Sequence, residues 1–156
     1  ASIYTVAQQV GTFRDSNVEI GIGNLSSLRG TAYEELLASL ELGTELPAEW
    51  ADENPETRTA VERALPIEGE ATRWGDELYF GSEIDIPAES PRAEVEPGTL
   101  AYWPQGNAIC LFWGPTPAST DDEPRAASPV NVFARADVSA FDPGSGGARL
   151  RLEDDD

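Results

Sequence analysis

The sequence predicts a mainly β fold, either a closed barrel or a sandwich, capped by one or two helices. Two observations support this class. The second half of the chain consists of short apolar runs separated by glycine and proline, and an earlier segment carries clear signals for the start and end of a helix. Closure removes exposed edge strands, so regular short strands favour it. At 156 residues, the chain has the length of one domain with a sizeable core.

The first 30 residues contain two β-like stretches, SIYTVAQQV and NVEIGIGNL, separated by glycine and serine. They indicate an edge hairpin or an N-terminal arm with extra strands. We therefore divide the chain into this arm over residues 1–30, a barrel domain over 31–153 and an acidic tail over 154–156.

The next segment, TAYEELLASLELG, supports two interpretations. Thr31 and Glu34 have the spacing of a capping box and Gly43 is a stop signal, which together favour a helix. Its apolar residues from Leu36 to Leu40 also alternate, and Gly43 with Thr44 makes an acceptable two-residue turn, which allows a β-hairpin.

The segment ENPETRTAVERALP has stronger helix signals. Asn54 stands at the cap position, Pro55 at the first helical position, and acidic residues precede the arginines, as the helix dipole prefers. Pro66 ends the helix. The inward-facing residues are Val61, Ala64 and Leu65.

The β-rich part begins after Pro66. Its strand-like runs are DELYF, SEIDI, GTLAYW, AICLFW, PVNVFARADV and ARLRLE. Alternation predicts one buried face in the last two runs, with Val130, Val132 and Ala134 inward in the first and Leu150 and Leu152 inward in the second. The polar stretch TPASTDDEPRAAS is predicted to be an exposed loop, and DPGSGG a turn.

The charge is strongly acidic. Ten cationic residues, all arginine, stand against 29 aspartates and glutamates, so the net charge is −19. This disfavours binding to nucleic acids and to anionic membranes. Surface carboxylates in place of lysines suit a salt-rich cytoplasm. Since no apolar run is long enough to cross a bilayer and the first residues lack the pattern of a signal peptide, we expect a soluble, cytoplasmic protein.

Several kinds of catalytic site are excluded. The chain has no histidine and one cysteine, which rules out an internal disulfide, the usual zinc sites and Ser-His or Cys-His catalysis. We interpret Cys110 as a buried, inert thiol rather than a nucleophile. Asp76 and Glu77 are adjacent on a predicted strand and therefore point to opposite faces, so they do not form an acid–base pair.

The acidic residues at 121–123 lack the spacing of a calcium loop and are interpreted as a solvated loop. We expect neither a metal ion nor a cofactor.

The stretch LAYWPQGNAICLFWG concentrates aromatic residues in two predicted strands joined by a tight turn. Both faces of the second strand are apolar, so it must be covered twice within the fold or leave an exposed apolar patch. The residues either fill the core or line a groove for a small molecule or an extended peptide. The candidate ligand-binding residues are Trp74, Tyr102, Trp103, Asn107, Phe112 and Trp113.

Three anchors, WGDELYF, GTLAYWPQGNAICLFWGPTP and SPVNV, resemble a small prokaryotic family of cyclophilin-like proteins of unassigned function, over roughly residues 50–153. The resemblance implies a closed cyclophilin-like β-barrel, and it favours the hairpin across Gly43 and Thr44 over the helix. It also implies that the aromatic stretch lies where true cyclophilins hold proline.

Cyclophilin prolyl isomerases use an active-site arginine together with a glutamine, a phenylalanine, a tryptophan and a histidine. This sequence has no histidine, and Arg73 is the candidate for the catalytic arginine, ahead of Arg92 and Arg125. We therefore expect a binding module for a small molecule or a proline-containing peptide segment, without assignable catalytic machinery. The alternatives are a weak prolyl isomerase and a structural subunit of a homo- or hetero-oligomer.

The acidic composition predicts that folding depends on salt. Potassium chloride should increase the stability of the fold because it screens the repulsion among surface carboxylates. Circular dichroism at about 0.1 M and at multimolar KCl measures this effect. Equal folding under both conditions would contradict the inferred salt adaptation.

Overall fold

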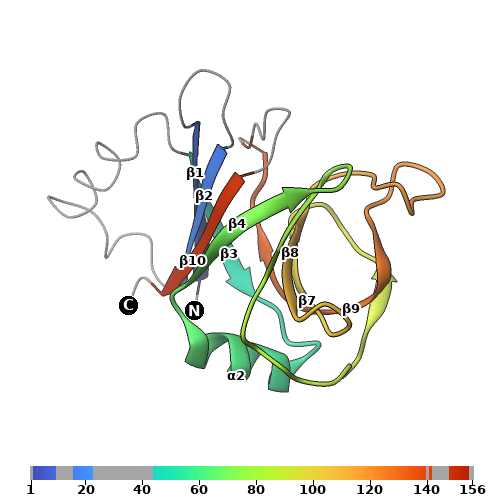
Figure 1. Cartoon of the computed structure of the whole chain (residues 1–156), viewed down its shortest axis with the longest axis horizontal. Helices are drawn as coiled ribbons and strands as arrows, with labels where there is room; N and C mark the ends of the chain where they lie inside the picture. The colour runs from blue at the N-terminus through green and yellow to red at the C-terminus, as the bar shows by residue number, and fades with distance from the viewer. Residues whose placement is uncertain (1, 10–15, 23–43, 140, 142–147, 155–156) are drawn as a thin grey trace, which may run out of the picture.

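The computed structural model describes residues 2–9, 16–22, 44–139, 141 and 148–154 (Figure 1). These residues form ten strands and one helix. The elements are β1 (Ser2–Gln9), β2 (Ser16–Ile22), β3 (Thr44–Trp50), α2 (Pro55–Ala64), β4 (Ile67–Arg73), β5 (Glu77–Gly81), β6 (Arg92–Glu94), β7 (Thr99–Trp103), β8 (Ala108–Phe112), β9 (Arg125–Ala136) and β10 (Ala148–Asp154). The predicted mainly β class is confirmed.

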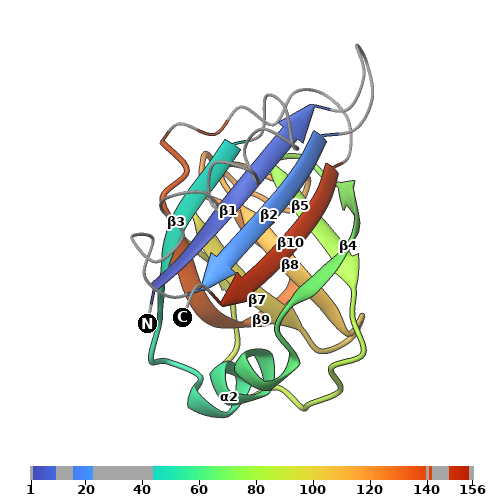
Figure 2. The same ribbon diagram turned by 90° about the vertical axis from the view of Figure 1, so that its left-hand side faces the viewer.

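The strands follow the order β1-β3-β2-β10-β4-β5-β8-β7-β9-β6, with additional pairings of β1 with β2 and of β3 with β9. Figure 2 shows β3, β1, β2, β10 and β4 side by side, and in Figure 1 this part of the sheet faces β8, β7 and β9. Both β-like stretches of the first 30 residues are strands. They pair with each other, β1 also pairs with β3, and β2 pairs with β10.

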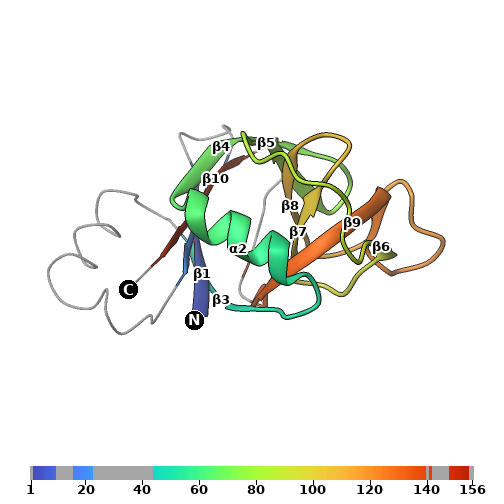
Figure 3. The ribbon, with the colours of Figure 1, turned by 90° about the horizontal axis from the view of Figure 1, so that it is seen from below.

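The prediction of a closed barrel is wrong, because the sheet forms an open half-barrel. Its two halves are joined by short pairings at the ends of strands. Strands β4 and β5 pair at only two positions, and β3 and β9 at three. Helix α2 lies across the lower end of the molecule, as Figure 3 shows from below.

The helix predicted from ENPETRTAVERALP is confirmed as α2, with Asn54 at its N-cap position, but the Asn54 side chain makes no capping hydrogen bond. The amide of Asn54 donates to the carbonyl of Val132 at 2.9 Å and accepts from the backbone N–H of Ser90 at 2.7 Å. The carboxylate of Glu89 instead accepts from the backbone N–H groups of Glu56 and Thr57, at 3.1 and 3.0 Å. The helix start is thus satisfied by a carboxylate that is distant in sequence.

The choice between helix and hairpin for residues 31–43 lies outside the described residues, as does the predicted turn at 142–147. The second half of the predicted hairpin is a strand, β3. In the part of the chain that the structure describes, no helix is long and apolar enough to cross a membrane.

The strands differ from the prediction in four places. The run SEIDI is not a strand, because the side chains of Tyr102 and Asn107 satisfy its backbone in place of a neighbouring strand: the Tyr102 hydroxyl donates to the carbonyl of Ile84 at 2.7 Å. Strands β4 and β6 were not predicted. Strand β9 begins at Arg125, inside the stretch predicted to be a loop, because Arg125 and Val130 pair with β6.

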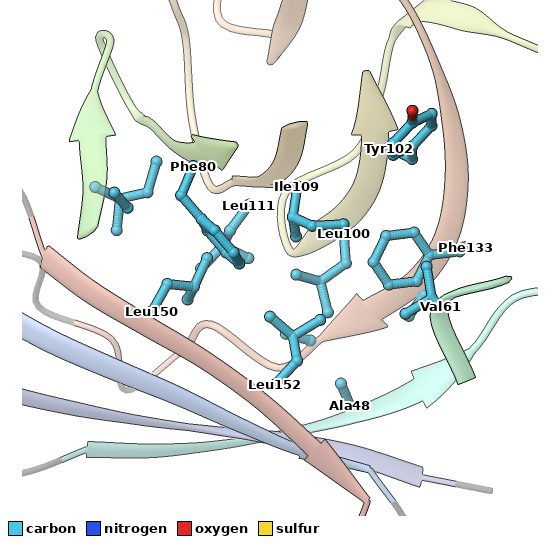
Figure 4. Packing of buried hydrophobic residues seen from close by; sticks show 14 of the residues in the cluster. Ala48, Val61, Phe80, Leu100, Tyr102, Ile109, Leu111, Phe133, Leu150 and Leu152 are labelled. Atoms are coloured by element: carbon cyan, nitrogen blue, oxygen red, sulfur yellow. The ribbon is translucent and has the colours of Figure 1, made fainter. Parts of the chain in front are cut away.

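The main core lies inside the half-barrel (Figure 4). Val61 of α2 and Leu150 and Leu152 of β10 are fully buried there, as predicted. Leu65 is partly buried, whereas Ala64, which was also predicted to face inward, is exposed. On the other face of β10, Arg149 and Arg151 form ion pairs with carboxylates of β4. The larger buried members of this core include Leu46, Leu78, Phe80, Leu100, Tyr102, Ile109, Leu111 and Phe133.

The prediction that Val130, Val132 and Ala134 share one face is wrong, because the pairing of β9 with β7 contains a register shift. Leu100 pairs with Ala134, whereas Ala101 pairs with Val132, so one extra residue of β9 stands opposite β7. Val130 and Val132 therefore belong to a second apolar cluster on the outer face of β7 and β8, whereas Ala134 belongs to the main core.

Gly98 is required at the turn before β7, and this predicts a large effect of Gly98→Ala. Its φ is +92°, and a Cβ atom there would lie 2.2 Å from the carbonyl oxygen of Ala136. The positive φ alone costs about 1–3 kcal/mol, and the clash adds to it. We expect chemical denaturation to show a loss of at least this size. Gly81→Ala is the matched control, since a Cβ atom at Gly81 meets nothing within 4 Å and should change stability little.

Candidate functional site

The hairpin of β7 and β8 is buried on both faces. Leu100, Tyr102, Ile109 and Leu111 face the main core. Ala101, Cys110 and Phe112 face the second cluster, which also contains Val95, Ala126, Val130 and Val132. Every residue of β8 is at most 2% exposed. The doubly apolar strand is thus covered twice within the chain, so its composition does not require a partner protein.

A pocket of about 220 Å³ opens where the cover over this outer face is incomplete. Side chains from β5, β7, β8 and β9 surround it, together with one residue before β5. The lining residues are Trp74, Glu77, Tyr79, Trp103, Cys110, Ala126, Ala127 and Val130. The lining is apolar and aromatic except for one carboxyl group, a composition typical of small-molecule sites.

The strand register places Glu77 in this pocket. Glu77 pairs with Phe112 and Tyr79 with Cys110, and residues opposite each other in an antiparallel sheet share a face. Glu77 is therefore directed to the outer face of β8 and is only 5% exposed. Its neighbour Asp76 forms an ion pair with Arg73 at 3.1 Å instead, so the two acidic side chains do separate, as predicted.

Burial gives Glu77 unusual electrostatics. Removal from water raises the pKa of Glu77 to about 7, and a hydrogen bond with the Cys110 thiol offsets part of that effect. Burial, together with the nearby Glu77 carboxylate, raises the pKa of Cys110 well above its usual value. The thiol therefore stays protonated, which agrees with the predicted inert cysteine, while Glu77 is present both as acid and as carboxylate at neutral pH.

Trp103 forms a wall of the pocket whose orientation is fixed. Its indole N–H donates to the hydroxyl of Ser128, and its ring meets Tyr79 edge-on, with centroids 6.4 Å apart. A Cβ atom at Gly106 would lie 2.5 Å from the Trp103 ring, so the glycine allows the ring to lie over the turn. Such constraints hold this wall of the pocket in one orientation.

The six predicted ligand-binding residues do not meet at one groove. Trp74 and Trp103 line the pocket, whereas Tyr102 and Phe112 are fully buried in two different clusters. Asn107 adopts a positive φ in the turn after β7, where its amide donates to the Tyr102 hydroxyl at 2.9 Å. Trp113 packs edge-on against Phe141 at 5.1 Å.

The candidate arginines are engaged in other contacts. Arg73 pairs with Asp76 and lies over the ring of Trp113, 5.4 Å from its centroid, and it does not line the pocket. Arg92 pairs with carboxylates of Glu53 and Glu96. Arg125 pairs with Glu94 and Glu123. We assign none of the three to the pocket.

The acidic loop at residues 121–123 is closed by its own hydrogen bonds. Glu123 accepts from the backbone N–H groups of Thr120 and Asp121, and these bonds, with Arg125, lower the pKa of Glu123 to about 2. In the described part of the chain, no three potential metal-ligating side chains of the His, Cys, Asp and Glu types come together.

Sequence reasoning missed Glu77 and Tyr79 as parts of the site. They alternate with the apolar residues Leu78 and Phe80, and this pattern indicates that Glu77 and Tyr79 share one face of the strand. Ala126, Ala127 and Val130 were missed because no local pattern shows that the start of β9 lies over β8.

Comparison with known proteins relates the chain to one family. A family model described as Cyclophilin-like matches residues 36–140. The solution structure of a hypothetical protein from Archaeoglobus fulgidus is similar, with a TM-score of 0.56 and 39% sequence identity, over 70% of this chain and 86% of the archaeal chain. No curated protein gives a significant match.

Glu77 predicts a specific pH dependence of stability. Its folded-state pKa of about 7 exceeds the ordinary 4.5, so the folded state binds the proton more tightly. This contribution to stability is complete below about pH 4.5 and is lost as the pH rises through about 7. A shift of this size corresponds to about 3 kcal/mol, and Glu77→Gln should remove that loss.

Denaturant unfolding of both proteins between pH 4 and 8 tests this, with the exposed Glu83→Gln as the charge-matched control. Parallel curves for wild type and Glu77→Gln would show that Glu77 is not buried as described.

Proposed function

Because the chain belongs to the cyclophilin-like family and has a pocket on the outer face of β8, we propose that it is a binding protein for a small molecule held in that pocket. The observation that carries the proposal is the pocket itself, an apolar, aromatic-lined cavity with a single carboxyl group in its wall. Such a site combines apolar burial with one polar group that orients the ligand.

The dimensions of the pocket favour a compact ligand over a peptide segment. Its volume of about 220 Å³ lies below the usual range for drug-sized ligands, roughly 300–1,000 Å³. A molecule with few heavy atoms fits this space, whereas an extended peptide would place a single side chain in it.

Ligand binding also accounts for features that folding alone does not require. A buried glutamate is costly unless it is paired with a positive charge, and here its partner is a weak thiol donor. Trp74, Tyr79 and Trp103 remain partly exposed around it, although aromatic side chains contribute most to stability when fully buried. A bound molecule would cover these rings and give the carboxyl group a partner.

The two alternative functions gain no support from the site. Among the described residues, no arginine lines the pocket, so a prolyl isomerase would lack the guanidinium that its chemistry needs. The doubly apolar strand is covered within the chain, so the argument for a structural subunit no longer applies to it.

The test is a screen of small neutral, cationic and anionic organic molecules by NMR, with the indole N–H signals of the four tryptophans as the readout. We expect binders to shift Trp74 and Trp103. Trp103→Ala should weaken their binding at least about tenfold, or ~1.4 kcal/mol, because it removes one wall.

Trp113→Phe is the matched control, since Trp113 packs on Arg73 and Phe141 and should leave affinity unchanged. A screen in which no molecule shifts Trp74 or Trp103, or in which Trp103→Ala binds as well as wild type, would overturn the proposed function. A proline peptide belongs in the screen, because enhanced cis–trans exchange of that peptide would favour the isomerase alternative.

A further inference from the structure

We propose that the ligand of this pocket is a compact organic cation, an ammonium group with small alkyl substituents, whose charge meets the Glu77 carboxylate and whose alkyl groups contact Trp74 and Trp103. This inference rests on the proposed function and specifies the class of ligand.

The charge of the pocket comes from Glu77. The other titratable lining groups are the phenol of Tyr79, on the same strand, and the thiol of Cys110 on β8. Strand β9 contributes Ala126, Ala127 and Val130, and β7 contributes Trp103. When Glu77 is ionised, the described lining therefore carries one negative charge with no positive charge in the wall, and a cationic ligand supplies it.

The aromatic walls favour the same class. Trp and Tyr rings attract a cation through their negative faces, most strongly for Trp and where water is excluded. Two tryptophans and one tyrosine line this cavity beside the carboxyl group. An alkylated ammonium is more weakly hydrated than a metal ion, and it presents apolar surface to the rings. It therefore loses less hydration free energy than a metal ion when it enters an apolar pocket.

The rigid part of the wall adds selectivity for size. Trp103 is held by the Ser128 hydroxyl and by its edge-on contact with Tyr79, so the pocket does not widen by rotation of that ring without breaking both contacts. With about 220 Å³ available, we expect small substituents such as methyl groups to be favoured over long ones.

Binding of a cation is expected to be coupled to release of the proton on Glu77. The burial that raises the pKa of Glu77 to about 7 leaves a large protonated fraction at neutral pH, and a cation favours the ionised form. Binding therefore releases protons, and affinity rises as the pH passes through about 7. A neutral ligand that accepts a hydrogen bond from protonated Glu77 would show the opposite trend.

The experiment compares choline with 3,3-dimethyl-1-butanol, its uncharged isostere in which carbon replaces nitrogen. Titrations of the full chain by calorimetry and by indole NMR are made at constant salt between pH 6 and 8. At pH 8 we expect choline to bind at least about tenfold more tightly than the isostere. Choline affinity should fall about tenfold from pH 8 to pH 6, following the ionised fraction of Glu77.

Glu77→Gln keeps the shape of the pocket and removes its charge. It should abolish both the preference for choline and its pH dependence while leaving the isostere bound. Glu83→Gln removes an exposed carboxylate and controls for the change in net charge.

Equal binding of both probes, or choline binding that survives Glu77→Gln, would overturn the cation assignment and leave the proposed function in place. If neither probe binds while another molecule of the screen does, the cation assignment likewise fails alone. If nothing shifts Trp74 or Trp103, the proposed function fails with it.

Discussion

The burial of the β7–β8 hairpin on both faces is the constraint on which the rest of the structure depends. A strand with two apolar faces needs two covers. The main core supplies one, and the second comes from Ala126, Val130 and Val132 of β9 together with Val95. The extra residue of β9 between Val132 and Ala134 allows one strand to serve both clusters. The pocket lies where this second cover stops short of Trp103 and Glu77.

The double burial of the β7–β8 hairpin also explains why the Glu77 side chain stays in the pocket. Strand β5 cannot turn Glu77 toward water without moving Leu78 and Phe80 out of the main core, because all three alternate on one strand paired with β8. The fold therefore bears the cost of desolvating Glu77 in order to keep its core. Destabilising polar groups of this kind are typical of functional sites, where stability is given up for a ligand.

Local patterns in the sequence predicted the helix that begins at Pro55 and the alternation of Leu150 and Leu152. They also showed that AICLF is apolar on both faces, but left open whether the strand is covered twice or leaves an exposed patch. What failed depended on contacts distant in the chain. Asn54 has a favourable cap position, yet Val132 and Ser90 bind its amide. The run SEIDI alternates like a strand, yet its backbone groups form hydrogen bonds with the Tyr102 hydroxyl instead of with a neighbouring strand. For the site, sequence identified Trp74 and Trp103 but placed Tyr102 and Phe112 beside them, because no local signal shows which face of a doubly apolar strand has the incomplete cover.

Glu77 also differs in its surroundings from the many carboxylates on the surface of this chain. Many acidic side chains on the surface, such as Glu53 and Glu96, share Arg92 and Arg135 with one another in solvent, where each pair contributes little. Glu77 faces a thiol and three aromatic rings in a pocket whose lining is mainly apolar. An electrostatic interaction is stronger in such surroundings than at the surface, so a single cation at Glu77 would gain more than one at any surface carboxylate. In a protein with net charge −19, the proposed selectivity for a cationic ligand would therefore depend on the burial of Glu77 rather than on the amount of negative charge.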